Sequence, residues 1–208
     1  DTSDAATHAN RLPAIIAAGI FAITAGIAAA AGMLGHDSAS APNLTTVASD
    51  WTVQDGQIGI TVKQLGNDVS GEFSDWTSAI VFDENAQAVA GTVETTINIG
   101  SLSLGTVTAQ AMGADFFDAS TYETAVFDAV IRWGNDGYEA VGTLQIKDTT
   151  LPLTLPFGLG IDGDTANMRA DITLDRRDFG IGDNVGDEAS LAFAVKVAIK
   201  LTATRAPE

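Results

Sequence analysis

The chain has 208 residues, of which 46% are hydrophobic and 18% charged, and its formal net charge is −17 at pH 7. This length and composition predict one folded core with room for an appended segment. The acidity argues against a nucleic acid partner, because phosphate binding requires clustered Lys and Arg. The chain has no Cys, which excludes disulfides, thiolate metal ligands and a Cys nucleophile.

The first predicted element is a helix over residues 12–34, LPAIIAAGIFAITAGIAAAAGML, a run of 23 residues without a charge. At about 1.5 Å rise per residue, such a helix is long enough to cross a hydrocarbon core. A signal peptide and a buried soluble helix are the competing interpretations. The acidic residues ahead of the run, Asp1 and Asp4, argue against a signal peptide.

The flanks of this run predict its orientation. Arg11 precedes it, and no Lys or Arg follows until Lys63. The positive-inside rule then places residues 1–11 in the cytoplasm and the rest of the chain outside. A stripe of small residues on the helix provides a surface for packing on a partner helix, since packing drives association in lipid. The stripe consists of Ala18, Ala22, Ala25 and Ala29.

Residues 35–50 are rich in Ser, Ala, Thr and Asp and predict a flexible linker. From Trp51 the apolar residues recur at every second position, which predicts half-buried antiparallel strands. Ala125, Phe127, Ala129, Ile131 and Trp133 share one predicted face, and Leu191, Phe193, Val195, Val197 and Ile199 share another. Gly, Asn and Asp clusters at 66–68, 134–137 and 162–164 supply the turns. Eight or nine strands in about 150 residues indicate a sandwich or a barrel.

Both histidines, His8 and His36, lie outside the domain that begins at Trp51. A Ser-His-Asp site within that domain is therefore impossible, and a His-based zinc site is nearly so. Its carboxylates, such as Asp115, Asp118, Glu123 and Asp128, are better explained as a solvated acidic face than as a catalytic pair. We therefore expect a protein that is not an enzyme, with no catalytic residue, no metal site and no tightly held cofactor.

Five segments of the domain resemble the YceI-like family of bacterial lipid-binding barrels. They are VSGEFSDWTSAIVFDE, SLSLG, DFFDASTYETAVF, YEAVGTLQIKDTTLPLTLPF and LDRRDFGIG, in that order from Val69 to Gly182. The resemblance covers essentially all of residues 51–208. It is specific because the order and spacing agree, although no single motif is strong. The His-Ser pair that many members carry in their first strand is absent here, where the chain reads DGQIGIT.

The resemblance implies an all-β fold: an extended eight-stranded antiparallel lipocalin-like barrel with a short helix, which we place near 103–112. It also implies a polyisoprenoid ligand such as a quinone. Some relatives follow a cytochrome b561-like membrane domain, and the predicted transmembrane helix is similar to such an anchor. The predicted protein is thus single-pass in a bacterial inner membrane, with its barrel in the periplasm. Its partner would be a cytochrome, or a respiratory or photosynthetic complex, bound through the alanine stripe. The alternative is an accessory subunit with a closed, ligand-free barrel.

We expect the ligand to lie among apolar side chains that face the bore and at its mouth. The candidates are Phe116, Phe117, Phe127, Ile146, Leu155, Phe179, Phe193 and Val195. Phe116, Phe117 and Phe179 have two interpretations: a lid over the ligand, or a structural plug with Asp118 and Asp178 capping the backbone nearby. For Arg176 we expect a structural ion pair with an acid.

The anchor prediction can be tested by fractionation. If residues 12–34 cross a membrane, the intact chain stays in the membrane pellet after a carbonate wash, because burial in the hydrocarbon core resists extraction. Deleting residues 1–48 should release the remaining domain into the soluble fraction. Recovery of the intact chain in the carbonate supernatant would contradict the prediction.

Overall fold

The computed structural model describes residues 49–207. The predicted cytoplasmic segment, the transmembrane helix and nearly all of the linker lie outside these residues. Within 49–207, none of the helices has the length and apolar character needed to cross a bilayer.

The described part of the chain is almost entirely β-structure, with irregular segments between some strands. The strands are β1 (Trp51–Gln64), β2 (Asn67–Phe73), β3 (Trp76–Phe82), β4 (Val89–Asn98), β5 (Leu102–Ser103), β6 (Thr124–Trp133), β7 (Tyr138–Ile146), β8 (Thr149–Asp162), β9 (Thr165–Asp175) and β10 (Leu191–Arg205). The one short α-helix, α1 (Thr108–Ala111), follows the 3₁₀ turns η1 (Ile99–Ser101) and η2 (Gly105–Val107), and η3 (Arg176–Phe179) follows β9. The predicted short helix near 103–112 is confirmed.

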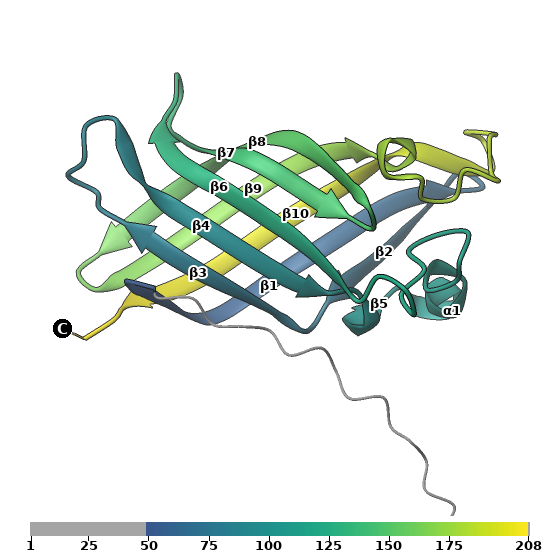
Figure 1. Ribbon diagram of the computed structural model, residues 1–208, viewed down its shortest axis with the longest axis horizontal. Helices are drawn as coiled ribbons and strands as arrows, with labels where there is room; N and C mark the ends of the chain where they lie inside the picture. Colours follow the sequence, from purple (N-terminus) through teal and green to yellow (C-terminus); the bar gives the residue numbers. More distant parts are fainter. Residues whose placement is uncertain (1–48, 208) are drawn as a thin grey trace, which may run out of the picture. The chain divides into compact units, whose positions relative to one another are not determined.

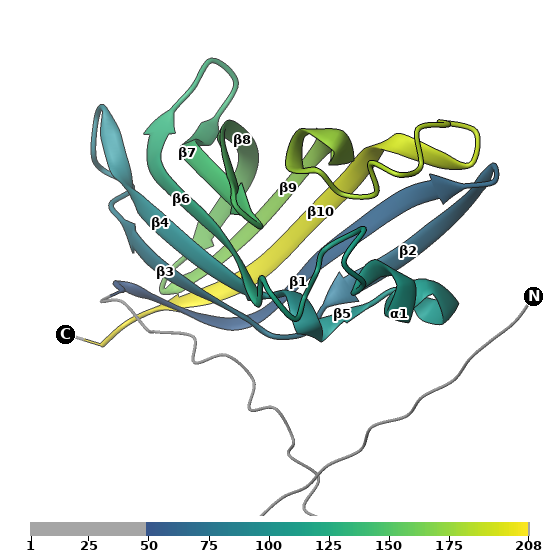
Figure 2. The same cartoon turned by 45° about the vertical axis from the view of Figure 1, so that its right-hand side comes forward.

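Eight of these strands form a closed antiparallel barrel (Figures 1 and 2). Going around the wall, the order is β1, β3, β4, β6, β7, β8, β9 and β10, and β10 pairs again with β1. The β1–β10 ladder extends from Trp51 opposite Arg205 to Gln64 opposite Leu191. Strands β2 and β5 extend the sheet beside the second half of β1. The predicted eight-stranded barrel is thus confirmed.

The wall has a seam between β1 and β3. Here the ladder consists of a single residue pair, Trp51 with Ile80. Ile58 of β1, seven residues after Trp51, pairs with Phe73 of β2, which lies seven residues before Ile80. β2 and β3 therefore pair with β1 in one continuous register, and the pairing is interrupted between these two points. The indole of Trp76 lies over Gly56 in the intervening stretch, where a Cβ on Gly56 would meet the ring at 2.6 Å. A glycine is required there because the indole occupies the space of a side chain.

Strand alternation sorts the side chains as the sequence predicts, with one difference at a strand end. Ala125, Phe127, Ala129 and Ile131 of β6 are buried inside the barrel. Trp133, the last residue of β6, is 62% exposed. Its ring meets Tyr138 edge-on at 4.5 Å, because at this end the barrel interior is already filled by other aromatic rings.

Aromatic rings close the barrel end to which β3 and β6 lead. Phe82 meets Tyr138 edge-on at 5.2 Å, and Phe157 stacks on Tyr138 at 5.9 Å. Trp51, 2% exposed, donates a hydrogen bond from its indole nitrogen to the carbonyl of Phe82 at 3.2 Å. Within residues 49–207, the strands and both hydrophobic clusters come from residues 51–205.

Two strands of the wall approach each other closely where Gly142 of β7 faces Ala129 of β6. A Cβ on Gly142 would lie 2.7 Å from the Cβ of Ala129 and closer still to the carbonyl oxygen of Asp128. Gly160 of β8, by contrast, has open space around the corresponding position. The absence of a side chain at Gly142 permits the close approach of β6 and β7 where the sheet curves into a barrel.

We predict that Gly142→Ala lowers the free energy of unfolding by about 1–3 kcal/mol, the usual cost of overpacking. Gly160→Ala is the matched control and should be neutral or stabilising by up to about 1 kcal/mol, because it only restricts the unfolded chain. Urea unfolding of residues 49–208 measures both. Equal effects of the two substitutions would show that the packing of β6 against β7 does not require a residue without a side chain at position 142.

Candidate functional site

The interior of the barrel contains a cavity of about 440 Å³. Apolar side chains from all eight wall strands line it, among them Ile58, Ile80, Phe127, Leu155 and Ile199. This volume lies within the range of about 300–1,000 Å³ typical of small-molecule sites. The lining can bind apolar chains by burial, and it offers few polar groups for chemistry.

The end of the barrel opposite the aromatic closure carries the irregular segments. The β1–β2 turn, α1 and the segment that follows η3 all lie there (Figures 1 and 2). Cavity-lining residues from these segments and from η2 include Leu65, Val107, Gln110, Val185 and Ser190. Leu65 is 73% exposed, so the cavity reaches the surface of the molecule at this end. We call it the mouth.

Two segments, 113–118 and 176–190, cover part of the mouth and are joined to each other. The amide of Gly182 donates to the carbonyl of Asp115 at 2.7 Å, and the side-chain amide of Asn184 donates to the carboxylate of Asp115 at 3.2 Å. The ring of Phe116 packs on Gly182, where a Cβ would meet the ring at 2.8 Å. We call these two segments together the lid.

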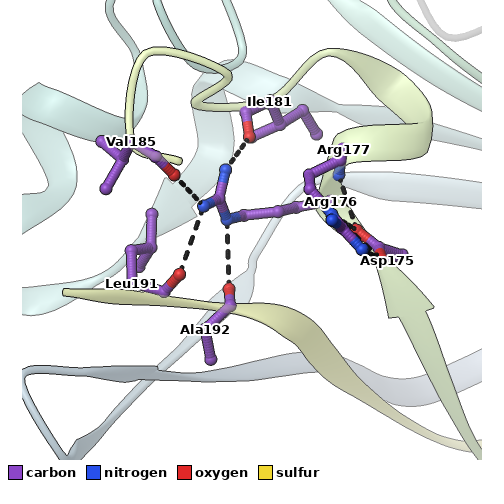
Figure 3. A network of polar contacts seen from close by, with 7 residues as sticks. All are labelled: Asp175, Arg176, Arg177, Ile181, Val185, Leu191 and Ala192. Atoms are coloured by element: carbon purple, nitrogen blue, oxygen red, sulfur yellow. Dashed lines mark hydrogen bonds and ion pairs between the residues drawn. The ribbon is translucent and has the colours of Figure 1, made fainter. Parts of the chain in front are cut away.

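Arg176 holds the second lid segment in place (Figure 3). Its side chain is 4% exposed, and its guanidinium donates only to backbone carbonyls. These are the carbonyls of Ala192 at 3.1 Å, Ile181 at 2.8 Å, Gly182 at 2.6 Å, Val185 at 2.6 Å and Leu191 at 3.2 Å. Burial lowers the pKa of this guanidinium from its ordinary value. One side chain thus organises the loop between η3 and β10.

The predicted ion pair belongs to the neighbouring residue, so the expectation for Arg176 was wrong. Arg177 donates from Nε to Asp175 at 2.9 Å, and this bond holds the pKa of the Asp175 carboxyl down to about 2. Because the pKa is lowered in the folded protein, the pair stabilises the fold above about pH 4, and this contribution is lost as the pH falls toward 2. Asp175 also caps η3 by accepting from the Arg177 amide at 3.0 Å.

Seven of the eight predicted ligand-binding residues line the cavity. They are Phe116, Phe117, Phe127, Ile146, Leu155, Phe179 and Val195. Phe117 also meets Phe73 edge-on at 6.3 Å, and Phe179 is 5% exposed, so the lid phenylalanines are packed into the core as well as facing the cavity.

Phe193 is the exception, and its predicted place in the bore was wrong. The β1–β10 register shifts between Val62 and Gln64, where the three residues 192–194 lie opposite Lys63 alone. Such a bulge breaks the alternation of side chains along a strand. Phe193 instead lies under the guanidinium of Arg177, 3.8 Å from the ring centroid, and does not line the cavity.

Sequence reasoning missed two features of the lining. Trp76 both lines the cavity and covers the β1–β3 seam, and only the aligned register of β2 and β3 reveals that role. Ser78 and Thr95 also line the cavity and share a hydrogen bond of 2.6 Å. The sequence does not show that these two residues face the interior, because Ser and Thr also occur on the outward faces of strands. Among residues 49–207, no cluster of three or more His, Asp or Glu is placed to hold a metal ion.

A closed eight-stranded antiparallel barrel with an apolar bore and a lidded mouth has the architecture of the lipocalin-like barrels. The family profile described as "YceI-like domain" matches residues 50–203. The chain belongs to the YceI-like family. The resemblance inferred from its motifs is confirmed.

Known relatives agree with this assignment. A UPF0312 protein of Yersinia pestis is 28% identical over 169 residues, which cover 73% of this chain and 88% of the relative. The crystal structure of Burkholderia cenocepacia BcnA has a TM-score of 0.66 at 28% identity and covers 72% of this chain and 96% of BcnA. A polyisoprenoid binding domain from Saccharophagus degradans, implicated in plant cell wall breakdown, shares the fold. Its TM-score is 0.57 at 12% identity, with coverage of 76% of this chain and 99% of that domain.

Because Arg176 is buried and Arg177 is exposed, replacing each of them by Lys should change the free energy of unfolding by different amounts. Arg176→Lys should lower the free energy of unfolding by about 3 kcal/mol, because an ammonium has three donors and leaves buried carbonyls unpaired. Arg177→Lys keeps a solvent-exposed pair and should cost less than about 1 kcal/mol. Urea unfolding measures both. Hydrogen exchange across 180–191 should accelerate in the first variant only, and an unchanged rate would argue that packing alone orders the lid.

Proposed function

We propose that this protein binds a polyisoprenoid lipid, such as a quinone, with its isoprenoid tail inside the barrel. The observation that carries the proposal is the apolar cavity of about 440 Å³ with a mouth at one end. A neighbour in fold is described as a polyisoprenoid binding domain, which supports the same class of ligand. Membership of the YceI-like family supports it independently.

The size of the cavity matches a short run of isoprene units. A cavity of about 150 Å³ accepts a six-carbon ring, so 440 Å³ corresponds to roughly 18 carbon atoms, between three and four isoprene units. Burying that many carbons gains on the order of 14 kcal/mol, whereas micromolar binding requires about 8 kcal/mol net. The difference covers the cost of ordering the tail. Units of a longer tail would extend beyond the cavity.

The proposal includes the cellular location of the protein. Residues 12–34 would anchor it in a bacterial inner membrane with the barrel in the periplasm, where it would serve a membrane electron-transfer complex. Burial in the bore would shield the apolar tail from water between membrane and partner. We further propose that the protein binds its lipid without catalysing a reaction, since the lining carries few polar side chains and no His.

Obstructing the bore tests the proposal. Val195 of β10 lines the cavity, so Val195→Trp should lower the amount of lipid extracted from purified protein, as measured by mass spectrometry. Overpacking costs about 1–3 kcal/mol, so the barrel should still fold. Ala198→Trp, on the exposed face of the same strand, is the matched control and should extract with undiminished lipid.

Two outcomes would contradict the proposal. A folded Val195→Trp variant with a full complement of lipid would show that the tail does not lie beside β10. A wild-type protein that yields no lipid, prepared without detergent as residues 49–208, would favour the accessory subunit with a ligand-free barrel.

A further inference from the structure

The ladder between β8 and β9 covers only part of each strand. It begins at the turn that joins them, where Asp162 lies opposite Thr165, and it ends where Gly158 lies opposite Arg169. Residues 149–157 of β8 and 170–175 of β9 do not pair with each other within the part of the chain that the structure describes. Figure 2 shows the β7–β8 hairpin diverging from β9. We call the boundary between these two stretches, which begins at the mouth, the slot.

The direction of the backbone amides along β8 follows from its two turns. Thr149 pairs with Ile146 across one two-residue turn, and Asp162 pairs with Thr165 across another. The residues that flank such a turn exchange both hydrogen bonds, so the amide of Thr149 points to β7 and that of Asp162 points to β9. Because amides alternate in direction along a strand, every even-numbered position of β8 faces β9.

Two prolines explain why the ladder stops. Pro152 and Pro156 occupy even-numbered positions of β8, and proline has no amide hydrogen. In the register of the existing ladder, the next hydrogen-bonded pair after Gly158 would join Pro156 to Asp171. That pair cannot form both of its bonds, so the ladder ends at Gly158. Within sheets, proline is confined to positions whose N–H side has no partner strand. The sequence of β8 thus keeps the slot free of a ladder.

Apolar side chains from both edges of the slot line the cavity. Leu153 and Leu155 contribute from β8, and Ile172 and Leu174 contribute from β9. An apolar chain that moves between the two strands therefore passes from one set of apolar side chains to another. Moving the two edges apart breaks no strand hydrogen bond, whereas the continuous β6–β7 ladder would have to lose several.

One side chain ties the two edges of the slot at the mouth. Lys147, in the turn between β7 and β8, donates from Nζ to the carbonyl of Gly180 at 3.1 Å, and Gly180 directly follows η3 on the other edge. Among residues 49–207 this is the one hydrogen bond between the stretches 146–157 and 170–183. Lys147 has φ 57°, a conformation that glycine adopts more readily, so the lysine stands there at a conformational cost.

We propose that the slot is a lateral gate through which the isoprenoid tail enters and leaves the bore, and that Lys147 is its latch. This inference rests on the proposed function and adds the route of exchange. A tail that moves sideways along the slot from the mouth does not have to be threaded end first past the lid. Opening requires release of the Lys147 hydrogen bond and a movement of the β7–β8 hairpin, while β7 stays paired with β6.

A covalent bridge across the slot tests the gate. The chain has no Cys, so Thr154→Cys and Thr173→Cys, at exposed positions on the two edges, can be joined specifically by a short reducible bismaleimide. The matched control joins Thr154→Cys to Val141→Cys, because Val141 is the partner of Thr154 in the β7–β8 ladder. Tryptophan fluorescence in a stopped-flow instrument measures uptake of geranylgeraniol, an uncharged isoprenoid alcohol, because Trp51 and Trp76 line the cavity. The protein is delipidated residues 49–208, which contain all the strands and both hydrophobic clusters described above.

We expect the bridge across the slot to slow uptake by about tenfold or more, because it prevents the opening step. Reduction of the bridge should restore the original rate, and the control bridge should leave the rate unchanged. An unchanged rate with the slot bridged, in a protein that still binds the alcohol, would overturn the gate and leave the proposed function intact. Failure of the wild-type protein to bind the alcohol would overturn the proposed function and the gate with it.

Loss of the latch should accelerate exchange in both directions. Lys147→Met keeps the aliphatic part of the side chain and removes the donor, so association and dissociation should each become about threefold faster or more. The dissociation constant should stay the same, because a gate changes both rates by one factor. Lys63→Met is the matched control: it removes a lysine at the same end that bonds to Asp68, and it should change neither rate. A Lys147→Met variant with altered affinity and unchanged association would show that Lys147 is not a latch.

Discussion

Closure of the sheet by the β1–β10 ladder is the constraint on which the rest of the molecule depends. Once the first and last strands pair, neither has a free edge along that boundary, and every strand has one face turned inward. Residues on the inward faces can meet only one another or a ligand, so the lining must be apolar. A cavity results because the side chains of an eight-stranded barrel just fill its width or leave room for one small ligand.

Closing the sheet leaves two open ends, and the protein fills them by different physical means. The end near Trp51 is filled by aromatic rings that belong to the strands themselves, and it needs no additional chain. The mouth is covered by two segments without regular strands, held together by hydrogen bonds from Arg176 and to Asp115. Segments of that kind open at lower free energy than strands do. The mouth is therefore where a ligand passes most easily.

Alternation predicted the strands well because it reports a strand's two faces directly. It placed Phe127 and Val195 each on an apolar face, and the family resemblance then favoured a barrel over a sandwich and turned these faces toward a bore. It failed where the period is broken: the bulge opposite Lys63 turns Phe193 away from the bore, although its neighbours alternate regularly. Arg176 and Arg177 are adjacent in sequence and differ completely in environment, and no local pattern distinguishes a buried guanidinium from an exposed one.

The strand that completes the barrel is the last of the eight wall strands to be synthesised. β10 pairs with both β9 and β1, and its sequence ends at Arg205. During synthesis, at about 5–20 residues per second, the other seven wall strands emerge before their closing partner exists. The nascent chain must keep an apolar inner face out of contact with other chains until then. The cavity is completed only when this last strand pairs, so the lipid of the proposed function would enter a barrel that is already closed.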